Sequence, residues 1–116
     1  MDSRRVVRVV TSGVPQLVQR VEIYDSVLRH IEEQHPEEFR RILDVYSTIA
    51  EPTRVHQSRT HSRSILFVSD DFVSTGGDPL RVPVKVFSDG TGIMTTAYFT
   101  SSKDQGELLW SETNAE

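Results

Sequence analysis

Residues 81–100, RVPVKVFSDGTGIMTTAYFT, carry the clearest β-hairpin signal in the chain. Two segments rich in β-branched and aromatic residues, 81–88 and 93–100, flank the turn sequence Asp-Gly-Thr-Gly at 89–92. Successive side chains of a strand point to opposite faces, so a loop of even length assigns every residue of this hairpin to one face. A loop of three residues would break that assignment.

An even loop gathers aliphatic residues on one face, which we expect to pack against helices. This expected inner set is Val82, Val84, Val86, Ile93, Thr95, Ala97 and Phe99. The opposite, outer set is Arg81, Pro83, Lys85, Phe87, Met94, Thr96, Tyr98 and Thr100. Cations bind phosphates, aromatic rings stack on bases, and a phenol or an amine can move protons where water is scarce. The plain alternative is that the outer set is merely the solvated side of a half-buried sheet.

The rest of the chain predicts a hairpin, then helices, then further strands. Apolar residues recur with helical spacing on either side of the His35-Pro36 step, where the proline disfavours helix at the preceding residue and suits the start of a second helix. In chain order we expect strands at 4–10 and 16–23, helices at 25–35 and 36–50, and strands at 53–59, 64–69, 81–88 and 93–100.

This order predicts an α+β fold, with helices segregated to one face of a sheet. Specifically, an N-terminal β-hairpin and two helices would pack on a mainly antiparallel four-stranded sheet. The 116 residues fit a single domain over 1–103. Residues 104–116 are acidic and polar apart from the apolar triplet 108–110, so we expect a C-terminal tail with one apolar anchor.

Composition excludes several classes of protein. The chain has no cysteine, which rules out disulfides, zinc–thiolate sites and a cysteine nucleophile. No apolar run is long enough for a membrane span, and the start, MDSRRVVRVV, does not resemble a signal peptide, so we expect a cytoplasmic protein. The net charge is −4, but the acidic excess lies in residues 22–51 and 104–116, and the remainder is basic.

The four histidines do not predict a metal site, and we expect no cofactor. His30 and His35 are five residues apart, about 140° around a helix, where two ligands on one helical face need a separation of four. His35 lies on the apolar stripe and is most simply a core or helix-end residue. His30 lies at the edge of the stripe, and a structural and a functional role stay equally open. No nucleophile elbow or phosphate-binding glycine loop is present.

Arg54 and His56 form a second candidate pair. They share one face of the strand expected at 53–59, and they would join Lys85 and Tyr98 if that face adjoins the last hairpin. Arg81 and Phe87, also in the outer set, are the remaining candidates for contact with a ligand. The plain alternative for Arg54 and His56 is an ordinary pair on the sheet surface.

Three short motifs give the chain a family resemblance. They are "LRHIEEQHPEEF" at 28–39, "IAEPTRV" at 49–55 and "VPVKVFSDGTGIMTTAYFT" at 82–100. Their order resembles the phage-associated branch of the barnase/EndoU/colicin/RelE-like nuclease superfamily. The matching residues are His30, Ile31, His35, Pro36, Pro52, Val55, Thr96, Ala97 and Tyr98.

The resemblance implies a small, toxin-like or phage-related endoribonuclease that needs no metal. Such enzymes drive the ribose 2′-hydroxyl onto the adjacent phosphate, which requires a base, a cation for the phosphate charge and an acid for the leaving oxygen. The implied catalytic residues are His30 as base or acid, Lys85 or Arg54 at the phosphate, Tyr98 as acid or donor, and Thr96 to position the phosphate. Arg54, His56, Arg81 and Phe87 would bind substrate.

A second hypothesis keeps the fold without the chemistry. The acidic helices, the acidic tail and the segment around Trp110 are also typical of a non-catalytic module that binds a protein. An open sheet edge would in addition allow a homodimer. Cleavage of RNA in the presence of EDTA discriminates between the two hypotheses.

Overall fold

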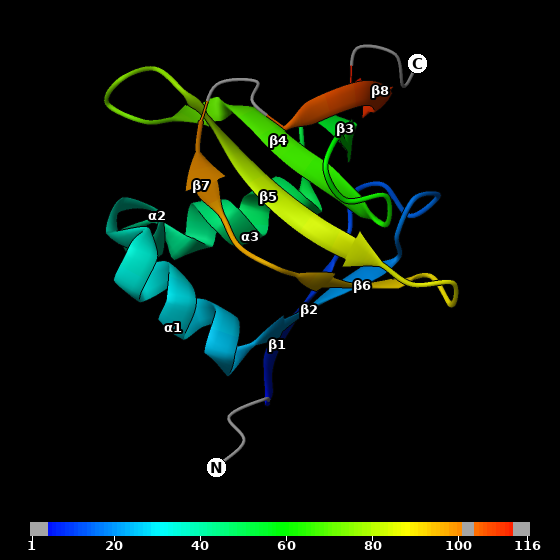
Figure 1. Ribbon diagram of the computed structural model, residues 1–116, viewed down its shortest axis with the longest axis horizontal. Coiled ribbons are helices and arrows are strands. Elements are labelled where there is room, and N and C mark those ends of the chain that lie inside the picture. The colour runs from blue at the N-terminus through cyan, green and yellow to red at the C-terminus, as the bar shows by residue number, and fades with distance from the viewer. Residues whose placement is uncertain (1–4, 101–103, 113–116) are drawn as a thin grey trace.

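A computed structural model describes residues 5–100 and 104–112. Figure 1 shows the helices gathered on one side of a twisted sheet. The strands are β1 (Val6–Thr11), β2 (Arg20–Tyr24), β3 (Arg54–Ser58), β4 (Ser64–Val73), β5 (Pro79–Val86), β6 (Thr91–Met94), β7 (Tyr98–Phe99) and β8 (Gln105–Ser111). The helices are α1 (Asp25–Gln34), α2 (Pro36–Arg40) and α3 (Ile42–Ala50).

The helical region breaks twice. His35 leaves helical geometry at the end of α1, as expected for a residue before proline, and Pro36 begins α2. The single helix expected over 36–50 is interrupted at Arg41, so it forms α2 and α3. Arg41 Nη1 donates to the carbonyl of Val73 at 2.8 Å, and Arg41 Nε donates to Asp44 at 3.0 Å. These bonds hold Arg41 between the helices and the end of β4.

The sheet differs from the expected four strands beside a separate hairpin. All eight strands form one mixed sheet in the order β1-β2-β6-β5-β4-β3-β8, with β7 also paired to β5. The N-terminal hairpin β1–β2 joins the rest because β2 pairs in parallel with β6, residues 20–22 against 91–93. The expected fold class is therefore wrong in strand number, in helix number and in the place of the hairpin. A parallel pairing between residues so far apart in sequence leaves no local signal.

The last hairpin contains a three-residue loop, which breaks the even alternation that the sequence suggested. Phe87 N donates to Thr91 O at 2.9 Å, and Gly90 adopts a φ of +89° at the position that a left-handed residue must occupy. Val84 consequently lies opposite Met94, and Lys85 lies opposite Ile93. The prediction was wrong for three residues, because Met94 is buried in the core while Ile93 and Thr95 are not core residues.

A second irregularity restores the pairing further along. Val84 pairs with Met94, and Arg81 pairs with Tyr98. Between these two pairs the chain advances three residues on β5 but four residues on the opposing segment. The one extra residue shifts the register, so Tyr98 pairs with Arg81. Tyr98 and Arg81 thus share the outer side of the sheet, as expected, although the route between them was not foreseen.

The expected acidic tail is largely a strand. Residues 105–111 form β8, which pairs antiparallel with β3. Leu109 and Trp110 pack against the core, and this burial outweighs the acidic character of the segment. The expectation of a tail beginning at 104 is therefore wrong for these residues, and 113–116 lie outside the described residues.

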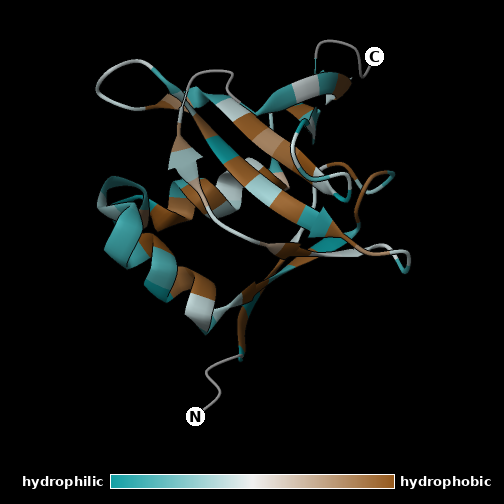
Figure 2. Cartoon of the chain, viewed as in Figure 1, coloured by the Kyte–Doolittle hydropathy of each residue, from teal (hydrophilic) through white to brown (hydrophobic). Residues whose placement is uncertain are grey.

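The core lies between the helices and one face of the sheet. Figure 2 shows apolar residues alternating with polar ones along β5, as expected for a strand with two different faces. Val82 and Val84 of β5 and Phe67 of β4 pack there with Val45 and Ile49 of α3. The opposite face of the sheet carries the polar residues described next. No helix in the described part of the chain is long and apolar enough to cross a membrane.

Candidate functional site

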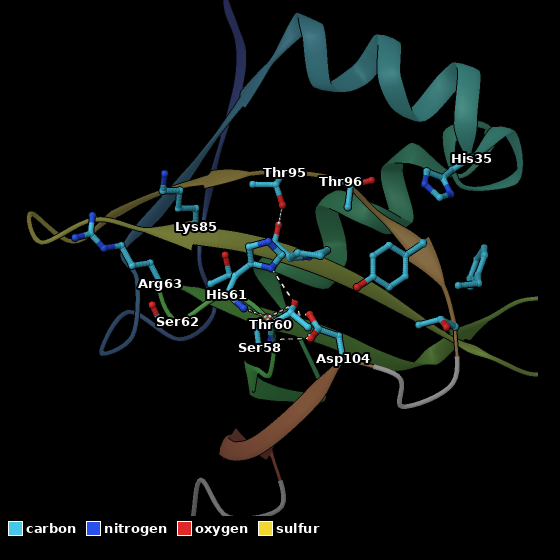
Figure 3. Close-up of a pocket in the computed structure, with 15 residues that line it drawn as sticks. His35, Ser58, Thr60, His61, Ser62, Arg63, Lys85, Thr95, Thr96 and Asp104 are labelled. Atoms are coloured by element: carbon cyan, nitrogen blue, oxygen red, sulfur yellow. Dashed lines mark hydrogen bonds between the residues drawn. The ribbon is translucent and has the colours of Figure 1, made fainter.

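A cavity of about 1050 Å³ opens on the sheet face opposite α3. Pro83 and Ser64 of neighbouring strands form part of its lining. The β3–β4 turn, the end of α1, β7 with the segment before it, and Asp104 also contribute (Figure 3). Seven of its lining residues are serine or threonine, namely Ser58, Thr60, Ser62, Ser64, Thr95, Thr96 and Thr100. Lys85, Thr96 and Tyr98, all expected from the sequence, are among the lining residues.

His35 and Tyr98 meet at one end of this cavity, which we call the imidazole end. Their ring centroids are 6.2 Å apart, and the His30 ring lies 5.7 Å from that of His35. His35 is half-buried and lines the cavity, whereas His30 is exposed and does not. The chain's break before Pro36 turns His35 out of the helix and toward β7 (Figure 3). His35, which the sequence suggested was structural, is the histidine that borders the cavity.

The Tyr98 phenol is neutral in the physiological range. Burial raises the pKa of Tyr98, the negative charge of Asp104 raises this pKa further, and the nearby Arg81 opposes both effects. A neutral phenol donates a hydrogen bond or a proton and cannot act as a base.

Among the described residues, Thr96 Oγ1 is the buried side-chain polar atom without a hydrogen-bond partner. Such an atom is costly in a folded protein, and a functional role is one explanation for it.

A buried carboxylate fixes the strand that carries Tyr98. Glu38 of α2 is only 7% exposed, and its Oε2 accepts a hydrogen bond of 2.7 Å from the backbone N–H of Phe99. The Arg41 guanidinium lies 4.9 Å from the centroid of the Phe99 ring. The same short helix that follows His35 therefore anchors β7, so the positions of His35 and Tyr98 are coupled.

The opposite end of the cavity, which we call the cationic end, contains Arg63 and Lys85. Ser64 and Lys85 are register partners on β4 and β5, and Val86 N donates to Arg63 O at 2.9 Å, so the two cationic residues lie on adjoining segments. Both side chains are exposed. The Lys85 ammonium lies 5.7 Å from the centroid of the Phe87 ring. Phe87 itself, a predicted binding residue, stands outside the cavity lining.

Asp104 organises the β3–β4 turn that borders the cavity. Its carboxylate accepts from Ser58 Oγ at 2.8 Å, Thr60 Oγ1 at 3.0 Å, and the backbone N–H groups of Arg59 and Thr60 at 3.1 Å each. Partial burial opposes ionisation, but these hydrogen bonds outweigh it and lower the pKa of Asp104. These four hydrogen bonds tie the Asp104 carboxylate to the β3–β4 turn and position the turn.

The predicted binding residues Arg54, His56 and Arg81 form a network outside the cavity lining. Arg54 makes a bidentate pair with Asp70, both bonds at 2.9 Å, and its Nη1 donates to Gln105 Oε1 at 2.9 Å. Arg81 is 2% exposed and donates to the same Gln105 oxygen at 2.7 Å. The hydrogen bonds of these side chains link β3, β4, β5 and β8 to one another. Their polar groups bind other protein groups, so these residues position the strands around the cavity and do not face a ligand.

His56 is held neutral in this network. Its Nδ1 lies 3.0 Å from Gly106 O and its Nε2 2.9 Å from Arg54 Nη1, so Nδ1 is the protonated nitrogen and Nε2 accepts. Burial lowers the pKa of His56, the bond to Gly106 opposes this shift, and the charges of Arg54 and Arg81 reinforce it. His56 and Arg54 do share one strand face, as the sequence indicated, but Lys85 lies apart from them.

Sequence reasoning missed His35, Arg63 and Asp104 as site residues. The segment SRTHSRS at 58–64 carries a signal that could have been used, because cations and hydroxyls alternate in a turn between two strands. Asp104 had no such signal, since its role depends on β8 returning to β3.

Within residues 5–100 and 104–112, no group of three His, Asp or Glu side chains is arranged to hold a metal ion. No protein-family model, curated protein or solved structure matches this chain.

Proposed function

We propose that this protein is a metal-independent endoribonuclease acting at the imidazole end of the cavity. The observation that carries the proposal is the meeting of His35 and Tyr98, with Thr96 on the same cavity wall and His30 beside His35. Two segments far apart in the sequence, residues 30–35 and 96–98, supply these groups. The motifs that resemble the barnase/EndoU/colicin/RelE-like nucleases supply the same residues, and a cytoplasmic location would give the enzyme access to RNA.

The proposed reaction is an internal transfer. His35 accepts the proton of a ribose 2′-hydroxyl, whose oxygen attacks the adjacent phosphorus and expels the 5′-oxygen of the next nucleotide. The products are a 2′,3′-cyclic phosphate and a 5′-hydroxyl. Tyr98, kept neutral by burial, gives its phenolic proton to the leaving 5′-oxygen, and the phenolate then regains a proton from water. His30, exposed next to His35, exchanges the proton with water, and the Thr96 hydroxyl positions the phosphate.

Labelled RNA incubated in EDTA tests this proposal. We expect cleavage by the wild type, with rate losses of roughly a hundredfold or more in both His35→Ala and Tyr98→Phe, the range typical of acid–base groups. Tyr46→Phe is the matched control, since this phenol lies on α3 over Arg8, outside the cavity lining. Thermal unfolding verifies that each variant folds. Intact RNA at high wild-type concentration would refute the proposal.

A separate observation favours a second candidate function, the binding of a protein. β1 is the terminal strand of the sheet, and Val6, Val7 and Val9 are between 40% and 52% exposed. An exposed apolar edge strand is a template for pairing with another chain, including a second copy of this one. Sedimentation velocity tests it: a monomer in the wild type whose mass does not rise with concentration would argue against a homodimer.

A further inference from the structure

Among the described residues, no ion pair neutralises the cationic end of the cavity. In the described part of the chain, neither Arg63 nor Lys85 forms an ion pair with a carboxylate. Asp104, the one carboxylate among the described lining residues, accepts four hydrogen bonds from the turn and forms no ion pair with either cation. Two neighbouring cations repel one another, and an anion bound between them removes that repulsion.

The turn that presents Arg63 is fixed before any ligand arrives. Gln57 Nε2 donates to Ser62 O at 3.2 Å and to Ser64 O at 3.0 Å, and these two bonds hold the backbone on either side of Arg63. Asp104 holds the other side through its four hydrogen bonds. A preorganised turn loses little conformational entropy when it binds a ligand, which favours affinity.

The two ends of the cavity are too far apart to act on one phosphate. Lys85 and Arg81 are four residues apart on β5, roughly 13 Å at about 3.3 Å per residue, and Arg81 is the register partner of Tyr98. The cavity volume of about 1050 Å³ lies at the upper limit of the roughly 300–1,000 Å³ typical of pockets for a single small molecule. The site therefore has room for a ligand longer than one nucleotide.

We propose that Arg63 and Lys85 form a second phosphate subsite, distinct from the phosphate at His35 and Tyr98, so that the ligand is single-stranded RNA of at least three nucleotides. This inference rests on the proposed function, because it takes the imidazole end as the place of the scissile phosphate. It moves Lys85 from the reacting phosphate to a neighbouring one. Unpaired RNA fits because its splayed bases can stack on an aromatic ring such as Phe87, beside Lys85.

The test compares ligands that differ by one phosphate. A 2′-O-methyl dinucleotide and trinucleotide, with one and two phosphates and a blocked 2′-oxygen, are titrated calorimetrically into the 116-residue chain. We expect Arg63→Ala and Lys85→Ala to weaken trinucleotide binding roughly tenfold and dinucleotide binding less than twofold. The matched control is Arg59→Ala, which removes the same charge from the same turn at a residue outside the cavity lining. It should change both affinities less than twofold.

Other outcomes overturn the inference. If the variants lose equal affinity for both ligands, Lys85 contacts the scissile phosphate. If they lose no affinity for either ligand, the second phosphate subsite does not exist. Tighter binding of a phosphoserine peptide than of the trinucleotide would assign the cations to a protein ligand instead. Cleavage of unmodified RNA separates the two proposals: a length-dependent subsite in a protein that cleaves nothing refutes only the proposed reaction, and His35-dependent cleavage without length dependence refutes only the subsite.

Discussion

Gln105→Leu is the most informative single substitution outside the cavity. Gln105 Oε1 accepts hydrogen bonds from Arg54 Nη1 at 2.9 Å and from Arg81 Nη1 at 2.7 Å. Leucine has a similar size but no oxygen, so both guanidinium groups lose a partner at once. If residues after 104 were a tail, this change would be silent. In the β8 arrangement it removes the link between β8 and the strand pair that carries Tyr98.

The two losses are unequal. Arg81 is 2% exposed, and among the described residues it retains only its 3.3 Å bond to Thr100 O. Water cannot replace the lost partner, so roughly 2–3 kcal/mol is expected for this charged donor. Arg54 keeps its bidentate pair with Asp70 and is partly exposed, so its loss is about 1 kcal/mol. Together Gln105→Leu should lower the free energy of unfolding by about 3–4 kcal/mol.

Urea unfolding followed by circular dichroism measures this free energy. Gln105→Glu is the matched control, because a carboxylate accepts the same two bonds and neutralises two cations, so its stability should equal or exceed that of the wild type. A loss below about 1 kcal/mol in Gln105→Leu, or an equal loss in both variants, would refute the reasoning and show that β8 is not held by this oxygen.

Three further predictions concern stability and the placement of β7. The folded state lowers the pKa of His56 below 6.5, so the contribution of neutral His56 to the free energy of unfolding is complete above pH 6.5 and is lost as the pH falls. The urea midpoint of the wild type should therefore decrease from pH 7.5 to 5.5, and that of His56→Gln should decrease less. Glu38→Leu leaves the Phe99 N–H unpaired and should cost about 1–3 kcal/mol by urea unfolding, whereas Glu38→Gln, which keeps a carbonyl acceptor, should cost less. Gly13→Ala would drive a methyl group into the Ala50 carbonyl and should cost about 1–3 kcal/mol or more, measured as a lower thermal midpoint; an unchanged midpoint would contradict this close approach.

Part of the candidate site was readable from the hairpin itself. The alternation along 81–86 separates the core residues Val82 and Val84 from the outward Lys85, and both Arg81 and Tyr98 lie on the outer side. The loop length was not readable, because Asp-Gly-Thr-Gly accommodates several turn geometries, and the three-residue loop moved Met94 into the core. The compensating extra residue before Tyr98 has no signature in the sequence.

The amino-acid sequence by itself determined what depends on neighbours along the chain: the N-terminal strand pair, the helix break before Pro36 and the strand periodicity after residue 53. Only the tertiary structure decided that β2 lies parallel to β6, that β8 completes the sheet, and that His35 rather than His30 borders the cavity. Local propensity acts over a few residues, whereas these features join segments up to some 70 residues apart, and their burial and hydrogen bonding repay the entropy of closing such loops only when the whole sheet forms.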